Sequence, residues 1–493
     1  MGTDDVGLVA MRARLNEHDS PTGQGVLVAL VEADAQTGKS SSAAHRYMPD
    51  ASHPGLRDVT FVDMSELTSP PEATSQHGTN MARNLCGSQG VAPGVAQVDV
   101  FLSRHWLAGG SLRSLSPSPP ATTSARVVSH SWISPAMPAS KELGLSSEEV
   151  TADVLRRVDY VVEHSDTIMV VGVNNGPNEA LPPLLSQAYN VIAVGVSDGS
   201  SSLGPTTLPI EIADRSKPDL VGPSGTTSEA TARVAGAAAL LVETAARHVD
   251  QVDARAASHA VTVKAALLAG ATKEEPEFDR PWMHSPEQPL DPRRGAGEIN
   301  IDNSQRLLNS ARVGKGATAT AVESGWDYSQ IRKGQTLRYE VEVSEHHRPK
   351  ALSVVIAWNR KIDVRTISLD KPARVLARPL ANLDLRVTTM GATGNDTTIA
   401  ESISAIDNVE HVYITVPAPG RYVIEVSCLD GETEFALAWQ ARGDLSAPID
   451  ELPLWVKLGL LVGAAVFLFA LGVLVFKLRD SGRTKLPPTP LGD

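Results

Sequence analysis

Cysteine is nearly absent from this chain of 493 residues, which contains only Cys86 and Cys428. The two lie far apart in the sequence and are expected in different domains. The sequence therefore excludes a framework of disulfides and a zinc site built from cysteines. So few thiols leave the redox compartment of the protein undetermined.

Basic residues are also fewer than acidic ones. The chain carries 44 Lys and Arg against 57 Asp and Glu, which gives a net charge of -13 with neutral histidines. Nucleic-acid-binding surfaces are rich in Lys and Arg, so we expect no nucleic-acid partner. A chain of this length is too long for one hydrophobic core, and about three structural units are expected.

A signal for export is missing from the start of the chain. Residues 1–20 contain acids and arginines but no apolar run of signal-peptide length. The other end differs, because residues 458–476 form a run of 19 residues without a charge. As a helix this run would span about 28 Å, which matches one crossing of a bilayer. The alternative is a buried core helix, but the extreme C-terminus leaves it nothing to pack against.

Charged residues around this run predict its orientation. Trp455 lies at the near interface, and one lysine, Lys457, precedes the run. Four basic residues follow it: Lys477, Arg479, Arg483 and Lys485. This asymmetry places the tail in the cytoplasm and residues 1–450 outside it. Because a large N-terminal region does not easily cross a membrane without a signal, we expect that the start is incomplete; the alternative is a tail-anchored protein with its bulk in the cytoplasm.

The first 300 residues alternate between strand-like and helical patterns. An apolar run at 26–31 is typical of a strand buried on both faces of a parallel sheet. Further strand-like runs lie at 97–102, 126–129, 167–171 and 190–196. The clearest helix runs from Ser146 to His164, with Ser146 and Glu149 as a capping box and a stripe of valines. This alternation predicts a doubly wound α/β domain.

Four polar positions are predicted to lie where doubly wound domains place their functional side chains. Glu32 directly follows the first strand, with Asp34 as a competitor, and Asn174 follows the strand at 167–171. His77 opens a helical pattern, and Thr227-Ser228 are predicted to cap a helix rich in small residues. Each has a plain structural alternative, respectively a solvated turn acid, an Asn-Gly turn, a structural histidine and a helix cap.

Taken in order, these residues and the motifs around them resemble the subtilisin-like serine peptidases, or subtilases. The resemblance covers about residues 20–312. The matching motifs are GQGVLVALVE from Gly23, HGTNMARNL from His77, GVAPGVAQV from Gly90, VVSHSWI from Val127, MVVGVNNG from Met169, NVIAVGVSD from Asn190, KPDLVGPSGTTSEATARVAGAAALL from Lys217, VKAALLAGA from Val263 and DPRRGAGEIN from Asp291.

The resemblance implies a serine endopeptidase acting on extended polypeptide. It makes Ser228 the nucleophile, His77 the general base, Glu32 the acid that orients the imidazole and Asn174 the oxyanion donor. Ser131, Trp132 and Ile133 would form the strand that pairs with substrate backbone. No cofactor or metal is required for this chemistry.

The chain departs from the family pattern near these residues. Glu32 replaces the usual Asp, Thr226 replaces the Gly before Thr-Ser, and Glu229 replaces the Met after the Ser. Ala232-Arg233 replaces a Pro-His pair. Glu229 adds a negative charge beside Ser228, which opposes an oxyanion unless it points away or pairs with a cation. The alternative function is therefore a degenerate peptidase fold that binds peptides or surface partners; an esterase is disfavoured because no G-x-S-x-G surrounds Ser228.

Residues 318–445 change to short alternating patterns without helices, as at Leu337, Tyr339, Val341 and Val343. They predict a β-sandwich that resembles the jelly-roll or pre-peptidase domains following bacterial subtilase domains. Its acids Asp384, Asp407 and Glu410 are predicted as solvated loop acids, with structural calcium ligands as the alternative. The predicted organisation is an extension at 1–22, a subtilisin-like domain at 23–312, a sandwich at 313–445, a linker at 446–457, a transmembrane helix at 458–476 and a basic tail at 477–493.

Overall fold

The computed structural model describes residues 6–34, 45–65, 74–248, 250–273, 281–314, 323–343, 349–365, 372–389, 397–415 and 418–443. The described residues up to Arg442 group into one compact unit. The predicted linker, membrane helix and basic tail at 446–493 lie outside the described residues. Within the described ranges, none of the helices has the length and apolar character needed to cross a bilayer.

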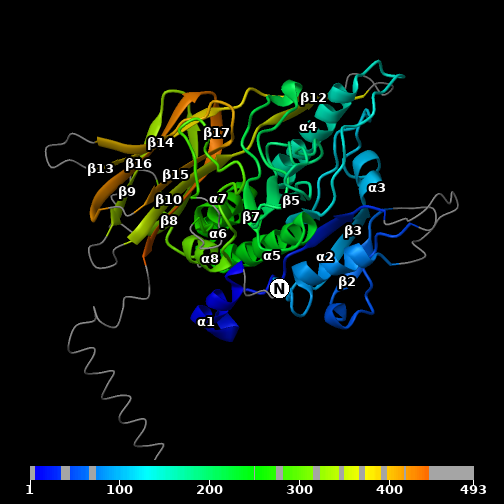
Figure 1. The fold of residues 1–493 in the computed structure, drawn as a ribbon, viewed down its shortest axis with the longest axis horizontal. Coiled ribbons are helices and arrows are strands. Elements are labelled where there is room, and N and C mark those ends of the chain that lie inside the picture. Colours follow the sequence, from blue (N-terminus) through cyan, green and yellow to red (C-terminus); the bar gives the residue numbers. More distant parts are fainter. Residues whose placement is uncertain are drawn as a thin grey trace, which may run out of the picture. The chain divides into compact units, whose positions relative to one another are not determined.

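A parallel sheet of seven strands forms the first part of the chain (Figure 1). Its order is β2-β3-β1-β4-β5-β6-β7, and every pairing is parallel. The strands are β1 (Val28–Glu32), β2 (Thr60–Asp63), β3 (Gln97–Leu102), β4 (Val127–His130), β5 (Ile168–Gly172), β6 (Ile192–Val196) and β7 (Leu220–Gly222). The first strand in the sequence thus lies inside the sheet, with β3 and β4 on its two sides.

Helices lie on both faces of this sheet. The described helices of this part of the chain are α1 (Leu8–Asp19), α2 (Gln76–Cys86), α3 (Ser103–Ala108), α4 (Ser147–Ser165), α5 (Thr227–Ala246), α6 (Gln251–Ser258), α7 (Ala260–Gly270) and α8 (Ile301–Leu308), with short 3-10 helices η2 (Pro54–Leu56) and η3 (Pro209–Glu211). Alternate strand residues enter separate cores: Val28 and Leu30 pack with α2, α5 and α7, whereas Ala29 and Val31 pack with α3 and α4. This two-sided burial explains the continuous apolar runs of the sequence.

Helix α5 is buried along nearly its whole length, as its small side chains predict. A Cβ atom on Gly236 would lie 2.8 Å from Val91 and 3.0 Å from the Leu85 carbonyl, so glycine permits the close approach of α2. One detail of the prediction was wrong. Thr226, and not the pair Thr227-Ser228, caps the helix, because its side chain accepts a hydrogen bond from Glu229 N.

Within the described residues, ten strands follow the α/β part, and the pairings recorded among them are antiparallel. They are β8 (Ser324–Arg332), β9 (Thr336–Val343), β10 (Pro349–Trp358), β11 (Ile362–Arg365), β12 (Arg374–Ala377), β13 (Asn382–Thr389), β14 (Thr397–Ser402), β15 (Val409–Thr415), β16 (Gly420–Asp430) and β17 (Glu432–Gly443). Two four-stranded sheets, β15-β10-β17-β8 and β14-β13-β16-β9, enclose one apolar core, and β11-β12 form a ribbon. Tyr339, Val341 and Val343 point into that core, so the predicted β-sandwich is confirmed.

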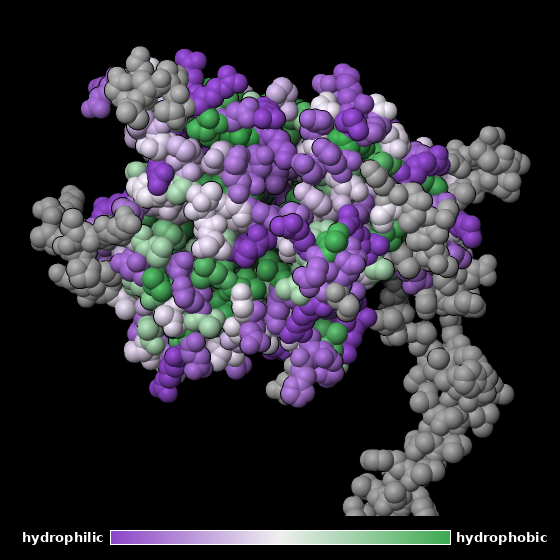
Figure 2. Space-filling view, turned by 180° about the vertical axis from the view of Figure 1, so that it is seen from behind, coloured by the Kyte–Doolittle hydropathy of each residue, from purple (hydrophilic) through white to green (hydrophobic). Residues whose placement is uncertain are grey.

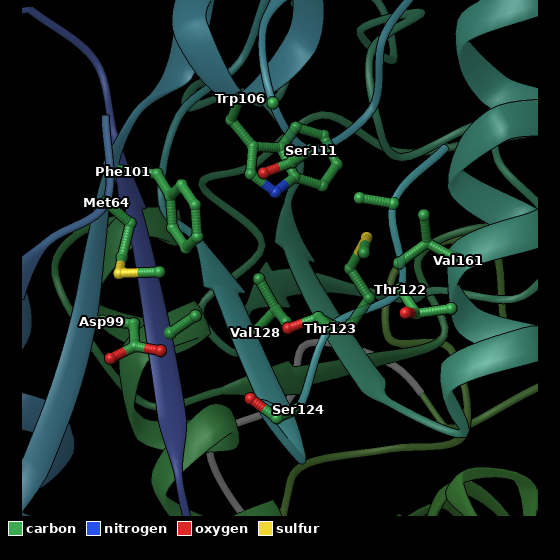
Figure 3. Close-up of a pocket in the computed structure, with 14 residues that line it drawn as sticks. Met64, Asp99, Phe101, Trp106, Ser111, Thr122, Thr123, Ser124, Val128 and Val161 are labelled. Atoms are coloured by element: carbon green, nitrogen blue, oxygen red, sulfur yellow. The ribbon is translucent and has the colours of Figure 1, made fainter. Parts of the chain in front are cut away.

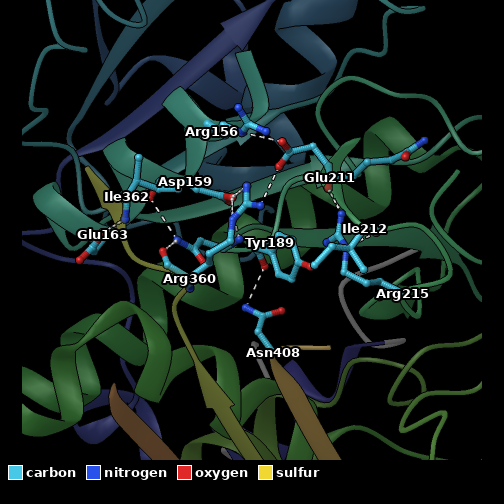
Figure 4. Close-up of polar contacts among 12 residues, drawn as sticks. Arg156, Asp159, Glu163, Tyr189, Glu211, Ile212, Arg215, Arg360, Ile362 and Asn408 are labelled. Carbon is cyan, nitrogen blue, oxygen red and sulfur yellow. Dashed lines mark hydrogen bonds and ion pairs between the residues drawn. The ribbon is translucent and has the colours of Figure 1, made fainter. Parts of the chain in front are cut away.

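The sandwich is joined to the α/β part by a buried ion network around Arg360 (Figure 4). The guanidinium of Arg360 lies 2.7 Å from Asp159 on α4 and 2.7 Å from Glu211 on η3. Arg156 on α4 pairs with the same Glu211 at 2.6 Å. Arg360, Asp159 and Glu211 are buried and Arg156 is partly exposed, so each buried charge has a partner that offsets the cost of its burial.

An aromatic ring lies at the centre of this network. Tyr189 is stacked between two guanidinium groups, with Arg215 3.7 Å and Arg360 4.2 Å from its ring centroid. Asn190 adds two hydrogen bonds to the backbone of Arg360: its amide donates to the carbonyl at 2.9 Å and accepts from the N–H at 2.8 Å. The segment around 189–215 is thereby held by a residue of the sandwich.

The face of the molecule shown in Figure 2 carries hydrophobic patches that are separated by hydrophilic residues. Single exposed apolar residues are ordinary on a protein surface. Ile133 is of more interest, because it is 41% exposed and belongs to the segment predicted to pair with substrate.

Candidate active site

Glu32 and His77 form a direct contact at the carboxyl end of β1. Glu32 is the last residue of that strand and is fully buried. His77 lies in the first turn of α2, where Ser75 caps the helix by accepting from Gly78 N at 3.0 Å. The imidazole Nδ1 lies 2.6 Å from Glu32 Oε2. A Cβ on residue 78 would lie 2.7 Å from the Tyr47 carbonyl, which explains the glycine after the histidine.

The electrostatics of this pair follow from burial and hydrogen bonding. The hydrogen bond to Glu32 raises the pKa of His77, while partial burial lowers it; the charges of Glu32 and Glu229 raise it further. Burial raises the pKa of Glu32, and the hydrogen bond to His77 opposes that rise. The other carboxylate oxygen, Oε1, is buried without a hydrogen-bond partner among the described residues. The imidazole is therefore the principal group that compensates for burying Glu32.

Asp34, the competing acid, has a different partner. Its Oδ2 lies 2.8 Å from His45 Nδ1, and its Oδ1 accepts from Arg46 N at 3.1 Å. The structure thus brings Glu32, and not Asp34, to His77.

Ser228 lies in the first turn of α5 and is bonded to the segment after β4. Its hydroxyl donates to the Ser131 carbonyl at 3.1 Å, and the Ser131 hydroxyl donates back to the Ser228 carbonyl at 3.0 Å. Across the described part of the chain, no hydrogen bond is recorded between Ser228 and His77. The charge of Glu229, the next residue, nevertheless raises the pKa of His77. The structure places serine and imidazole on adjoining helices without joining them.

Asn174 follows β5 and is fixed through its backbone. Its N–H donates to Ser202 Oγ at 2.9 Å, and its carbonyl accepts from Ser202 N at 2.8 Å. No hydrogen bond of the Asn174 side chain is recorded within the described residues, which leaves its amide available to a ligand.

Asn175, which the sequence-based prediction treated only as part of an Asn-Gly turn, connects two elements of the site. Its side-chain oxygen accepts from Thr227 N at 2.9 Å and from Thr227 Oγ1 at 3.2 Å. It therefore ties the first turn of α5 to the end of β5. The doubled Asn at 174–175 was the only signal in the sequence for this contact.

The predicted substrate-pairing segment is mostly covered. Ser131 and Trp132 are buried, and Trp132 packs edge-on against His130, with the ring centroids 5.8 Å apart. Ile133 is the exposed member of the three. Contacts with a ligand would consequently come from backbone groups and from the Ile133 side chain.

The departures near Ser228 have structural partners. Thr226 serves as the helix cap, as described above. Arg233 is buried, and its guanidinium donates to Asn84 Oδ1 at 3.2 Å and to the Pro223 carbonyl at 2.5 Å. It thereby joins α5 to α2 and to the turn before α5.

The acids predicted as solvated or calcium-binding are not exposed. Asp384, Asp407 and Glu410 are all buried, so the prediction of solvated loop acids was wrong. Asp407 accepts from Ser216 N at 2.8 Å, and Asp384 pairs with Arg386 at 2.9 Å. Within the described ranges, no group of three or more His, Cys, Asp or Glu is placed to hold a metal ion.

Comparisons with known proteins add little to this geometry. No protein-family model matches the sequence, and no curated protein matches it. Among solved structures, the chain is similar to the epidermin leader peptide processing serine protease EpiP from Staphylococcus aureus, with 13% identity and a TM-score of 0.41 over 63% of this chain and 81% of that chain. It is also similar to the Bacillus licheniformis lipase BlEst2 in propeptide form, with 11% identity and a TM-score of 0.18 over 62% of this chain and 66% of the lipase. Both TM-scores lie below 0.5, so neither similarity identifies the activity.

Proposed function

We propose that the protein is a subtilisin-like serine endopeptidase that acts on extended polypeptide. The observation that carries the proposal is the buried carboxylate of Glu32 held 2.6 Å from the Nδ1 atom of His77. This pairing leaves the Nε2 atom of the imidazole for a second partner, and Ser228 lies on the adjoining helix. A carboxylate, an imidazole and a serine hydroxyl are the groups that nucleophilic acyl transfer requires.

In the proposed reaction, His77 Nε2 takes the proton of Ser228 Oγ while that oxygen attacks the substrate carbonyl carbon. Glu32 holds the imidazole in the required tautomer and stabilises the imidazolium that forms. The Asn174 amide and the N-terminus of α5 stabilise the oxyanion. His77 then returns the proton to the leaving amine, and water releases the acyl group from Ser228 by the same steps. Before this sequence starts, the Ser228 hydroxyl has to turn from the Ser131 carbonyl to His77.

The second candidate is a binding module with the same fold and no catalysis. Two observations favour it: the Ser228 hydroxyl donates to Ser131, and Glu229 places a carboxylate near His77. A negative charge beside the nucleophile opposes the oxyanion. Such a module would hold peptides or surface partners through the segment at 131–133.

Labelling with a fluorophosphonate probe, which reacts with activated serine hydroxyls, separates the two candidates. We expect the wild-type chain to take up the probe and Ser228→Ala to lose the label. Ser224→Ala is the matched control, because Ser224 is buried in the turn that precedes the same helix, and it should label like the wild type. His77→Ala should lower turnover by roughly 100 to 10,000-fold, since it removes the base. Equal labelling of wild type and Ser228→Ala would end the peptidase proposal.

We also propose that residues 458–476 anchor the chain in a membrane, with residues 1–450 outside the cytoplasm. The support is the 19-residue uncharged run and the basic residues that follow it. In that arrangement the peptidase would act on polypeptides close to the membrane surface.

A further inference from the structure

A cavity of about 220 Å³ lies on the face of the parallel sheet that carries α3 and α4 (Figure 3). Strands β1, β3, β4 and β5 supply its floor, and the segment 121–124 forms a rim with exposed positions at Thr122 and Ser124. The cavity is separate from the candidate active site. Ala29, in its lining, precedes Glu32 by three residues on β1, which corresponds to about 10 Å along an extended strand.

Among the described residues, a carboxylate without a cationic partner lies in the cavity wall. Asp99 on β3 is 8% exposed, and its Oδ1 accepts one hydrogen bond, from Gln97 Nε2 at 2.9 Å. No ion pair of Asp99 is recorded in the described part of the chain. Because a buried carboxylate is costly unless it is paired, this side chain favours a positively charged ligand.

A second polar group faces the same space. Trp106 on α3 is 4% exposed, and none of the hydrogen bonds recorded among the described residues involves its indole N–H. Figure 3 shows the indole nitrogen directed toward the cavity and Asp99 on another wall of it. A ligand would therefore meet a hydrogen-bond acceptor at Asp99 and a donor at Trp106.

Apolar side chains cover the space between these two groups. Phe101, Val128, Val161 and Met169 line the cavity. A cavity of about 150 Å³ is large enough for benzene, so about 220 Å³ accommodates one aromatic ring with a short substituent.

We propose that this cavity binds a small protonated amine whose apolar body carries a hydrogen-bond acceptor at its other end. The ammonium group would bind Asp99, the body would fill the apolar middle, and the acceptor would receive the Trp106 N–H. This binding does not depend on the proposed peptidase activity.

Tyramine and its neutral analogue tyrosol provide a matched pair of probes, since they differ only by an ammonium group in place of a hydroxyl. Calorimetry on the full-length wild-type chain should show tyramine binding about tenfold more tightly, because the ammonium adds a charge-assisted hydrogen bond. Asp99→Asn should abolish that preference. Asp58→Asn, which changes an exposed acid outside the cavity, should retain it.

A second variant keeps the proposal testable if Asp99→Asn does not fold. Gln97 is exposed, so Gln97→Ala should fold normally; it removes the amide that competes for Asp99 and should strengthen the preference for tyramine. Three results would overturn the proposal: no binding of tyramine to the wild type, equal binding of tyramine and tyrosol, or an undiminished preference in a folded Asp99→Asn protein.

Discussion

At the scale of single residues, the contact between Glu32 and His77 predicts that turnover depends on Glu32 far more than on Asp34. Glu32→Gln keeps the size of the side chain but removes the charge that supports the imidazolium. We expect turnover to fall by about 10,000-fold, as when a triad acid loses its ability to fix the tautomer. Asp34→Asn is the control, because Asp34 is bonded to His45, and its effect should be mild. Peptide hydrolysis by both variants tests this, and a crippled Asp34→Asn with an active Glu32→Gln would reverse the assignment.

Glu229 adds a prediction about pH. Its charge raises the pKa of His77, and the imidazole acts as a base only above that pKa. Glu229→Gln should lower the pKa of His77 and move the acid limb of the kcat/KM profile to lower pH. Glu179→Gln, at an exposed position, should leave the limb in place. A limb that stays fixed or moves to higher pH in Glu229→Gln would refute the role given to its charge.

At the scale of elements, the ion network around Arg360 can be compared with an exposed ion pair of the same sandwich. Arg360 is 5% exposed and pairs with Asp159 and Glu211, whereas the Arg378 side chain is 60% exposed and pairs with Asp363. Arg360→Met removes the ion-pair partner of the buried Asp159 and one of the two arginines that pair with Glu211, and it should lower the free energy of unfolding by about 3–5 kcal/mol. Arg378→Met should change it little, because solvent screens exposed pairs. Urea unfolding of both variants measures the difference. An equal loss of unfolding free energy in the two variants would contradict a larger contribution from the buried network.

Elements with strong local patterns could be predicted from the sequence. The strand at 97–102 was located with its observed bounds, and the helix predicted at 146–164 is α4, with its Ser146–Glu149 capping box. Strand β2 was missed because its four residues lie at the sheet edge and none of them is buried. The meeting of Glu32 with His77 could be expected from family motifs. The Asn175 contact with Thr227 and the Ser228 contact with Ser131 could not, because both depend on how separate elements pack.

At the scale of the whole molecule, the charge distribution around 458–476 predicts on which side of a membrane the folded part lies. Protease added to intact cells should digest residues 1–450 and leave an epitope tag after residue 493 protected. Permeabilised cells provide the control, since both parts should then be accessible. If the folded part and the tag were both protected in intact cells, the protein would instead be tail-anchored with its bulk in the cytoplasm.

Asn190 and Arg360 contact each other in the folded protein but are synthesised at different times. These residues are bonded to each other although 170 positions separate them in the sequence. A ribosome that adds about 5–20 residues per second needs roughly 10 to 30 s to make the intervening chain. During that interval the segment around Tyr189 has no guanidinium from Arg360 above its ring. The α/β part therefore emerges during synthesis well before the sandwich can complete it.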